Sequence, residues 1–366
     1  MTGLLVHEWI APSGGSENVL EAMADAFPDA DIQCLWTDAP HRLADRNLRE
    51  TWIARTPIRR SKALALPFTV PTWRMLKADR AYDWMLVSSH LFAHHARIRG
   101  QDIPELVYVH SPARYIWTPE YDERGASAMI RAVAPLFKLI DRHRAAEAAA
   151  IAANSAFVRR RVQDAWERDA VVIHPPVEVE RIARIHEWSA RLTDDERRLL
   201  DALPEVFVLG ASRFVPYKRL DLVIAAAEAA NVPAVIAGRG PDEELLRAQA
   251  GEASVPVQIV HSPSDSLLWA LYERASVFVF PAIEDFGIVP VEAQVLGTPV
   301  VTGPVGGQLE TFVDGETGVV AESTDATDLA HALVRALDLP AFDGPAATAE
   351  YSLSVFQRNI QEFVAS

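Results

Sequence analysis

The sequence has a single cysteine, Cys34, and no long apolar run. One cysteine cannot form an internal disulfide, and no cysteine-rich spacing is present for a structural zinc ion, so we expect a protein of the reducing cytoplasm. Because about 18 uncharged apolar residues never follow one another, no helix should cross a bilayer, which leaves peripheral membrane contact open. The opening residues MTGLLVHEWI lack the basic segment and cleavage site of a signal peptide and are predicted to form a buried first strand.

An excess of positive charge is also missing. The chain has 35 Lys and Arg against 50 Asp and Glu, a net charge of −15, so we expect no nucleic-acid partner, because nothing offsets the repulsion by phosphates. Residues 1–180 hold 22 Lys and Arg against 23 Asp and Glu, while residues 181–366 hold 13 against 27. Eight of the nine Trp precede residue 189. These differences indicate two domains with different tasks.

The pattern of apolar runs predicts the fold class. Short runs such as WMLVSS, ELVYVH, VFVLGAS and SVFVFPA alternate with longer helical segments, which is typical of α/β domains with doubly wound parallel sheets. The length of 366 residues suits about two such domains. Two domains imply a cleft between them.

The domain boundary is expected near residues 177–204, a polar stretch that follows a Pro-Pro breaker. We predict an N-terminal Rossmann-like domain over 1–180, which would bind an acceptor, and a C-terminal one over 181–345 that faces it across the cleft. The alternative is that the polar stretch is a surface helix within one domain. Residues 346–366 have apolar residues at helical spacing, which predicts a closing helix that packs back toward the N-terminal domain.

Cations follow one of the predicted strands. Parallel strands present ligand-binding residues at their carboxyl ends, so the loops after the strands are the places to search. Arg213 and Lys218 come after VFVLGAS. The planar guanidinium of Arg213 and the point charge of Lys218 together suit a diphosphate. A solvated basic turn is the alternative that these residues alone leave open.

Two glutamates follow the strand SVFVFPA. Glu284 comes first and Glu292 follows with seven residues between them. Pro290 suits the first turn of a helix and Gly297 its end, so we predict a helix that begins near residues 287–288 and directs its free amides toward the cleft. Carboxylates accept hydrogen bonds from sugar and ribose hydroxyls. Favourable placement of acids at a helix start explains Glu284 but not Glu292.

Glycine pairs stand at two further predicted helix starts. Gly14 and Gly15 follow the first strand, and Gly306 and Gly307 follow the strand TPVVTG. Backbone amides at such positions can approach an anion closely. Taken singly, each pair is also a common turn.

Together these segments resemble the GT-B glycosyltransferases of the family 4 type, which are retaining enzymes that use nucleotide sugars. The resemblance covers nearly the whole chain. It rests on GGSE (14–17), SSH (88–90), YVHSPARYIW (108–117), ANSAFVRRRV (153–162), HPPVE (174–178), SRFVPYKRLD (212–221), GRGP (238–241), EDFGIVPVEAQVLGTPVV (284–301) and GGQLE (306–310). The paired glutamates downstream of Arg213 and Lys218 are its most specific part.

The resemblance implies a role for each side chain. Arg213 and Lys218 would bind the donor diphosphate, and Glu292 the ribose hydroxyls. Glu284 would bind hydroxyls of the transferred sugar, and His110 would stand near the reacting sugar. His110, Glu284, Arg213 and Lys218 are then the expected catalytic residues.

Further donor contacts implied by the resemblance involve the main chain. Residues 286–288 would lie beside the sugar and its phosphates, the first glycine pair would bring amides to the phosphates or the acceptor, and residues 238–240 would border the base. The expected additional donor-binding residues are Gly14, Gly15, Gly238, Arg239, Phe286, Gly287 and Ile288.

The chemistry of the reaction agrees with these roles. Breaking the bond between the anomeric carbon and the phosphate leaves negative charge on the diphosphate and an oxocarbenium-like sugar, so fixed cations and amides around the leaving group lower the barrier. Two routes to retention stay open. Either the leaving phosphate accepts the acceptor's proton on the same face, or a protein nucleophile such as Glu284 attacks first.

No essential metal or other cofactor is expected. Asp29 and Asp31 match a two-aspartate metal motif of another glycosyltransferase fold, but they lie in a polar stretch between a predicted helix and strand. His90, His94 and His95 have a spacing that metal ligands can have, yet no HExxH motif occurs and no nearby carboxylate completes an obvious site. We expect these histidines to pack or to contact the acceptor.

Other classes find less support. GxxxxGK[ST] and GxSxG motifs are missing, and Gly238-Arg-Gly-Pro lacks the third glycine of the dinucleotide fingerprint. A UDP-sugar-dependent transferase, a nucleotide-sugar epimerase, a phosphorylase and an inactive nucleotide-sugar-binding protein are the alternatives. We favour GDP-mannose as donor, because YVHSPARYIW and GGSE look most like bacterial mannosyltransferases of cell-surface glycan assembly.

A basic segment over residues 53–80 has seven Lys and Arg and a single acidic residue, interleaved with apolar side chains. Such a segment can lie against an anionic membrane or bind a lipid-linked pyrophosphate acceptor. We expect Arg59, Arg60, Lys62 and Trp73 to make this contact, with the protein peripheral on the cytoplasmic face of the inner membrane. A solvated basic face with a few buried anchors is the alternative.

Overall fold

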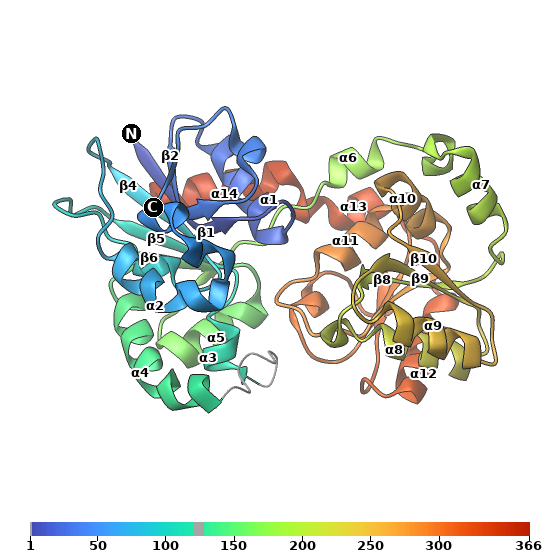
Figure 1. The fold of residues 1–366 in the computed structure, drawn as a ribbon. Helices are drawn as coiled ribbons and strands as arrows, with labels where there is room; N and C mark the ends of the chain where they lie inside the picture. The colour runs from blue at the N-terminus through green and yellow to red at the C-terminus, as the bar shows by residue number, and fades with distance from the viewer. Residues whose placement is uncertain (1, 120–127) are drawn as a thin grey trace. The chain divides into compact units, whose positions relative to one another are not determined.

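The computed structural model describes residues 2–119 and 128–366. The chain divides into two compact units (Figure 1). The N-terminal unit comprises Met1–Pro176 and Leu353–Ser366, and the C-terminal unit comprises Val177–Ser352. Among the described residues, no helix combines the length and the apolar character that crossing a membrane requires.

The N-terminal unit contains a parallel sheet of seven strands in the order β3-β2-β1-β4-β5-β6-β7. The strands are β1 (Gly3–Ile10), β2 (Asp31–Thr37), β3 (Leu48–Glu50), β4 (Trp84–Ser89), β5 (Glu105–Val109), β6 (Ala150–Ala153) and β7 (Val171–Val172). The helices are α1 (Gly15–Ala26), α2 (Lys62–Trp73), α3 (Arg114–Trp117), α4 (Ala128–Ala145), α5 (Ala156–Trp166) and α14 (Leu353–Ala365). Strand β1 is buried along its whole length, as its apolar sequence predicts.

The order of the strands reverses at β1, which pairs with β2 on one side and β4 on the other. Right-handed crossovers in such an order place helices on both faces of the sheet. The loops that follow β1 and β4 therefore meet at the carboxyl edge, where ligands bind in sheets of this type.

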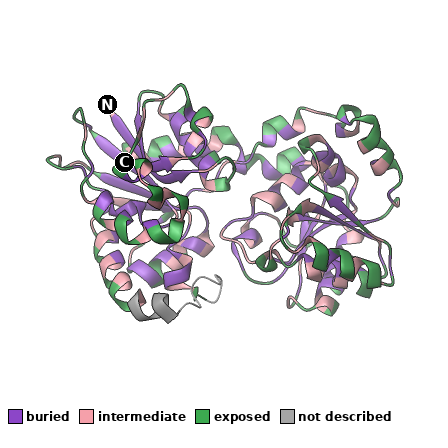
Figure 2. Ribbon diagram, in the orientation of Figure 1, coloured by how far each residue is buried: buried purple, intermediate pink, exposed green. Residues whose placement is uncertain are grey.

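Helix α14 ends the chain and packs in the N-terminal unit. Phe356, Ile360 and Phe363 are buried in the core beneath the sheet, and the Gln361 side-chain amide donates to the carbonyl of Ala26 at the end of α1 at 2.8 Å. The apolar residues of α14 recur at helical spacing, so one face of the helix covers the core. Figure 2 shows that the strands of the sheet are largely buried.

The C-terminal unit contains a second parallel sheet, of six strands in the order β10-β9-β8-β11-β12-β13. The strands are β8 (Val208–Arg213), β9 (Ala234–Arg239), β10 (Val257–His261), β11 (Val277–Phe280), β12 (Val300–Thr302) and β13 (Gly318–Val320). The helices are α6 (Val179–Ala183), α7 (Asp194–Asp201), α8 (Leu220–Ala229), α9 (Glu243–Glu252), α10 (Asp265–Arg274), α11 (Ile288–Val295), α12 (Ala326–Leu337) and α13 (Gly344–Thr348).

The two sheets confirm the prediction of two Rossmann-like α/β domains. In the C-terminal sheet the order reverses between β8 and β11, which are hydrogen-bonded neighbours. The loops after these two strands carry the cations and the first glutamate that the sequence marks for function. The topology alone brings them side by side.

Candidate functional site

The site in the C-terminal unit is built around an ion pair between Lys218 and Glu284. Lys218 ends the short 3₁₀ helix η8 (Pro216–Lys218) after β8, and Glu284 lies in the loop after β11. The Lys218 ammonium donates a hydrogen bond to the Glu284 carboxylate. The two side chains are 11% and 20% exposed, so the pair is largely sheltered from water.

Aromatic rings surround the Lys218 ammonium. Its Nζ atom lies 5.3 Å from the ring centre of Tyr217 and 5.5 Å from that of Phe280. The Tyr217 hydroxyl also accepts a hydrogen bond of 2.5 Å from the exposed guanidinium of Arg213. Tyr217 therefore positions both cations, a role that the sequence analysis missed because a Tyr in a basic turn carries no signal by itself.

The loop that holds Glu284 is fixed by the glycine-rich turn after β12. The amide of Gly307, the first residue of the 3₁₀ helix η9 (Gly307–Glu310), donates to the Glu284 carbonyl at 2.7 Å. The Glu284 amide donates to the buried side chain of Gln308 at 3.1 Å. A Cβ atom on Gly307 would lie 2.0 Å from the Asp285 carbonyl oxygen, so only glycine allows this contact between the loops.

Helix α11 begins where the sequence predicts. Its N-cap is Gly287, with φ of 118°, a conformation that L-residues rarely adopt. A Cβ atom there would lie 2.8 Å from Cβ of Gln308. Gly297 stands beyond the end of the helix with φ of 81°, as expected for a terminating glycine. The free amides of this helix start adjoin the loop of Glu284, and the partial positive charge there favours an anion.

Glu292 occupies a different environment, within α11. Burial, together with the nearby carboxylates of Glu178 and Asp265, raises its pKa to about 8. Its side chain is half-buried. The structure thus places Glu284 in the loop and Glu292 on the helix, as predicted, and at neutral pH the carboxyl of Glu292 is largely protonated.

The end of β9 lies against the end of β8. The Phe214 amide donates to the Arg239 carbonyl at 2.8 Å. Gly238 has φ of 148°, and a Cβ atom on it would lie 1.9 Å from the Ser212 carbonyl oxygen. The Arg239 side chain is exposed. Residues 238–240 therefore stand at the same sheet edge as Arg213.

In the N-terminal unit, Gly14 is the N-cap of α1 and Gly15 its first residue. The buried carboxylate of Glu17 folds back over this helix start. It accepts hydrogen bonds from the Ala11 amide at 3.1 Å and from the Ser16 hydroxyl at 2.8 Å. A Cβ atom on Gly14 would lie 2.1 Å from this carboxylate, so the glycine is needed for the fit.

His110 follows β5 and ends a chain of hydrogen bonds. Its Nε2 atom lies 2.8 Å from the Ser88 hydroxyl, which in turn lies 3.0 Å from Nδ1 of His7. Burial holds the pKa of His110 well below its ordinary value, and the neighbouring His90 and His7 lower it further. His110 is therefore a neutral imidazole, and one hydroxyl links it to a second neutral imidazole in β1.

Glu8, also in β1, anchors the loop after β4. Its buried carboxylate accepts hydrogen bonds from the amides of Leu91 at 2.8 Å and Ala93 at 2.9 Å, and its Oε2 atom lies 3.1 Å from Nδ1 of His90. Burial alone would raise the pKa of Glu8, but His90, His7 and the amides outweigh it and the pKa is lowered. The expectation that no carboxylate lies near His90 is wrong.

A second carboxylate meets the other two histidines. Asp141 of α4 accepts four hydrogen bonds, from Nε2 of His94 and His95 at 2.9 Å each and from Nε1 of Trp117 and Trp166 at 2.7 Å each. The same ligand types can bind a cation, both here and at His7, Glu8 and His90. At Asp141 the four N–H donors already satisfy the carboxylate, which indicates a structural network. That no metal is essential stays a prediction.

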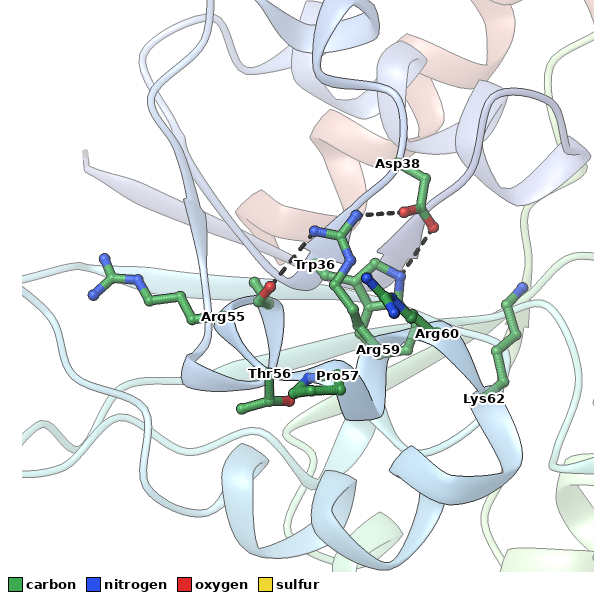
Figure 3. A pocket seen from close by; sticks show the side chains of 9 residues that line it. Trp36, Asp38, Arg55, Thr56, Pro57, Arg59, Arg60 and Lys62 are labelled. Carbon is green, nitrogen blue, oxygen red and sulfur yellow. Dashed lines mark hydrogen bonds and ion pairs between the residues drawn. The ribbon is translucent and has the colours of Figure 1, made fainter.

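The basic segment forms a pocket at the carboxyl end of β2 (Figure 3). Arg59, Arg60 and Lys62 line it, and their contact with an acceptor or a membrane stays a prediction. Trp73 is different, because it is completely buried in the core of the unit. Its expected contact with acceptor or membrane is wrong: sequence spacing put it with the exposed apolar residues of α2, but it is an anchor of that helix.

Comparison with known families agrees with the two units. Residues 13–181 match the family described as Glycosyltransferase Family 4, and residues 193–352 match the family described as Glycosyl transferases group 1. The two matches do not overlap and together take in most of both sheets.

Two curated relatives are about a third identical to the chain over the segments that align. One is the GDP-mannose-dependent alpha-(1-6)-phosphatidylinositol monomannoside mannosyltransferase of Mycolicibacterium smegmatis, 34% identical over 189 residues, which are 47% of this chain and 48% of the relative. The other is the D-inositol 3-phosphate glycosyltransferase of Mycobacterium sp. (strain JLS), 33% identical over 44% of this chain and 38% of the relative. The chain spans about half the length, or less, of these relatives.

Among solved structures, Anabaena HepE has the same fold. Its complex with UDP gives a TM-score of 0.71 at 18% identity over 100% of both chains, and its complex with UDP-glucose gives 0.70 at 17% identity over 99% of both. With the motifs, the two family matches and this fold in agreement, the chain belongs to the GT-B glycosyltransferases of the family 4 type.

Proposed function

We propose that this protein transfers a hexose from a nucleotide diphosphate sugar to a glycan or lipid-linked acceptor, with retention of the anomeric configuration and without a metal or cofactor. The observation that carries the proposal is the ion pair of Lys218 with Glu284, which adjoins the free amides of α11 at the point where the strand order reverses. This arrangement offers a cation and amides to a diphosphate, and a carboxylate to the sugar attached to it.

The proposed reaction assigns each group a task. Arg213, Lys218 and the amides of residues 286–288 stabilise the charge that develops on the diphosphate as the bond from the anomeric carbon to the phosphate oxygen breaks. The acceptor oxygen forms its bond to that carbon on the same face, and its proton passes to the departing phosphate oxygen. Glu284, which is ion-paired, then serves the sugar hydroxyls better than it serves as a nucleophile.

The remaining groups hold the donor. Glu292 binds the ribose hydroxyls, and Gly238 with Arg239 borders the base. In the N-terminal unit, Gly14 and Gly15 bring amides to the phosphates or the acceptor. His110, a neutral imidazole tied to Ser88, accepts or donates a hydrogen bond near the reacting sugar.

The proposed donor is GDP-mannose. The motifs YVHSPARYIW and GGSE support it, and so does the mannosyltransferase from Mycolicibacterium smegmatis, whose name gives GDP-mannose as donor. A UDP-sugar is the second candidate, because HepE was solved with UDP-glucose. The protein would act in the cytoplasm, with the basic segment in peripheral contact with the membrane.

A donor panel tests the proposal. The purified chain is titrated with GDP-, UDP-, ADP- and dTDP-sugars while the melting temperature and the slow hydrolysis of the donor are followed. A ligand that binds only the folded state raises the melting temperature in proportion to the logarithm of its concentration. We expect one nucleotide to give the largest rise and to be hydrolysed. If none of the sugars shifts the melting temperature, the proposal fails.

A further inference from the structure

A basic pocket of about 770 Å³ opens beside Trp36, at the carboxyl end of β2 (Figure 3). Four cationic side chains line it, against the single carboxylate of Asp38: Arg55, Arg59, Arg60 and Lys62. They come from the 3₁₀ helices η2 (Trp52–Arg55) and η3 (Pro57–Arg60) and from the first residue of α2. In a chain with a net charge of −15, four cations around one cavity require an explanation.

Arg59 neutralises Asp38, the one acidic side chain that lines the pocket. Its guanidinium forms an ion pair with Asp38 at 2.5 Å and donates to the Thr37 carbonyl at 3.2 Å. The other Asp38 oxygen accepts a hydrogen bond from Nε1 of Trp36 at 3.1 Å. Asp38 and Arg59 therefore form a neutral, fixed wall of the pocket.

The other three cations of the pocket lie on its exposed side. Within residues 2–119 and 128–366, Arg55 and Arg60 form no ion pair, and both side chains are exposed. Lys62 is exposed as well, and its ammonium lies 4.3 Å from the ring centre of Trp9. Figure 3 shows Arg55 and Lys62 on opposite sides of Arg59 and Arg60. Guanidinium and ammonium groups are the side chains that bind phosphate oxygens by charge-assisted hydrogen bonds.

Ring contacts connect the pocket with the histidine cluster of the same unit. Trp36 stacks on Trp9 with ring centres 5.3 Å apart, and Trp9 meets the edge of His90 at 5.0 Å. The ring of His90 lies 6.3 Å from that of His110. Trp9 and His90 therefore lie between Trp36 of the pocket and His110, the imidazole that the proposed reaction places near the sugar.

Apolar side chains stand next to the cations. Leu64 and Phe68 lie four residues apart on α2 and are 66% and 41% exposed, and Trp52 beside them is 49% exposed. The rings of Trp52 and Phe68 meet edge to face at 6.1 Å. An exposed apolar ridge beside a cationic pocket suits a molecule that has a phosphate at one end and a hydrocarbon at the other.

We propose that this pocket binds a phosphate or pyrophosphate group of the acceptor, with Arg60 and Lys62 as its principal ligands and Arg59 as the fixed wall. The inference rests on the proposed function, since it concerns the acceptor of that transfer. Both a lipid-linked and a soluble phosphorylated acceptor offer this group. The ridge of Trp52, Leu64 and Phe68 favours the lipid-linked form.

Inorganic pyrophosphate tests the site directly. We expect isothermal titration of the full chain to detect two binding events, one at this pocket and one at the proposed diphosphate site of the C-terminal unit. The double variant Arg60→Ala/Lys62→Ala should lose the first event or weaken it about tenfold or more, as removal of two charge-assisted contacts implies. Lys218→Ala should lose only the second.

The control removes the same charge from elsewhere in the unit. Lys77 and Arg99 are exposed and form no ion pair in the described residues, so Lys77→Ala/Arg99→Ala should bind pyrophosphate like the unmodified protein. Equal binding by the pocket variant and this control overturns the inference. Failure of the proposed function would show separately, because Lys218→Ala would then bind pyrophosphate at both sites like the unmodified protein.

Vesicles distinguish the two sources of phosphate. The unmodified protein should sediment with phosphatidylcholine vesicles that contain a polyprenyl diphosphate. Less of the Arg60→Ala/Lys62→Ala variant should sediment. Less of the Leu64→Ser/Phe68→Ser variant should sediment as well, but its binding of pyrophosphate should be unchanged. If vesicles do not bind while pyrophosphate still requires Arg60 and Lys62, the site takes a soluble phosphorylated acceptor. If vesicle binding persists in Arg60→Ala/Lys62→Ala, the pocket is not the phosphate site of a lipid-linked acceptor.

Discussion

The ammonium of Lys218 donates a hydrogen bond to the carboxylate of Glu284, and this ion pair joins the loops after β8 and β11. In the proposed reaction a diphosphate bound to Lys218 would share this ammonium with Glu284, whose charge would repel the anion. The pair would then couple recognition of the sugar to recognition of the phosphates.

Glu284→Gln removes that charge and keeps the shape of the side chain. We expect the bare nucleoside diphosphate to bind as well as before or more tightly, because the repulsion is gone. Transfer and donor hydrolysis should fall about 10²–10³-fold, the usual cost of removing one stabilising contact from a reacting group. Calorimetry with the bare nucleotide and turnover measurements check both parts. Weaker nucleotide binding together with full activity contradicts the assignment.

Gly287→Ala tests the close contact of the two loops. With φ of 118° and a Cβ atom 2.8 Å from Cβ of Gln308, the new side chain should destabilise the unit by about 1–3 kcal/mol and weaken donor binding. Gly251→Ala is the matched control, since its Cβ atom meets nothing within 4 Å and alanine is the better helix former. Urea denaturation gives the free energy of unfolding of each variant for the comparison. Similar stability of the two would count against the strained contact.

Glu292→Gln tests the raised pKa of the helix glutamate. Its ordinary pKa of 4.5 is raised to about 8, so between these values the folded chain holds a proton that the unfolded chain has released. Stability therefore falls as the pH rises from about 4.5 to about 8, and the variant removes this loss. At pH 8 we expect its Tm to exceed that of the unmodified protein by several degrees, since about 1 kcal/mol moves the Tm of such a domain by about 2–4 °C.

At pH 4 the two proteins should melt within a degree or so of each other, because the Glu292 carboxyl is then mostly protonated in both the folded and the unfolded chain. Glu244→Gln, at an exposed position in α9 of the same unit, is the control. It should follow the unmodified protein at every pH. If all three proteins lose stability in parallel as the pH rises, Glu292 does not titrate as described.

Asp141→Asn tests the network in the core of the N-terminal unit. The amide nitrogen that replaces one carboxylate oxygen faces two of the four N–H donors and the negative charge is lost, so we expect a loss of about 3–5 kcal/mol in the free energy of unfolding. Asp102→Asn removes an almost fully exposed carboxylate that is paired with Arg97 at 3.3 Å, and should cost under about 1 kcal/mol. Tryptophan fluorescence during urea denaturation compares the two variants. Equal losses would show that the buried network contributes little.

Local sequence signals predicted part of the structure well. Pro290 and Gly297 marked the first turn and the end of a helix, and α11 runs from Ile288 to Val295. The apolar runs marked most strands. Strand β6 was missed, because its sequence AIAA consists mainly of alanine, which favours helices and gives no strand signal.

Contacts between distant residues were not predictable in the same way. Glu8 reaches His90 and Asp141 reaches His94 across 82 and 47 residues, and only the pairing of strands and the packing of α4 bring them together. Trp73 belongs to a segment rich in exposed apolar residues, but tertiary packing buries it. Residue type and spacing suggest chemistry, whereas burial depends on the complete fold.

The central claim is that Lys218 holds the donor's diphosphate. Its most direct test is the Tm of Lys218→Ala against Lys77→Ala, each with and without the sugar nucleotide that stabilises the unmodified protein most. We expect the nucleotide to raise the Tm of Lys77→Ala as much as that of the unmodified protein, and to leave that of Lys218→Ala unchanged. An undiminished rise in Lys218→Ala would contradict the account.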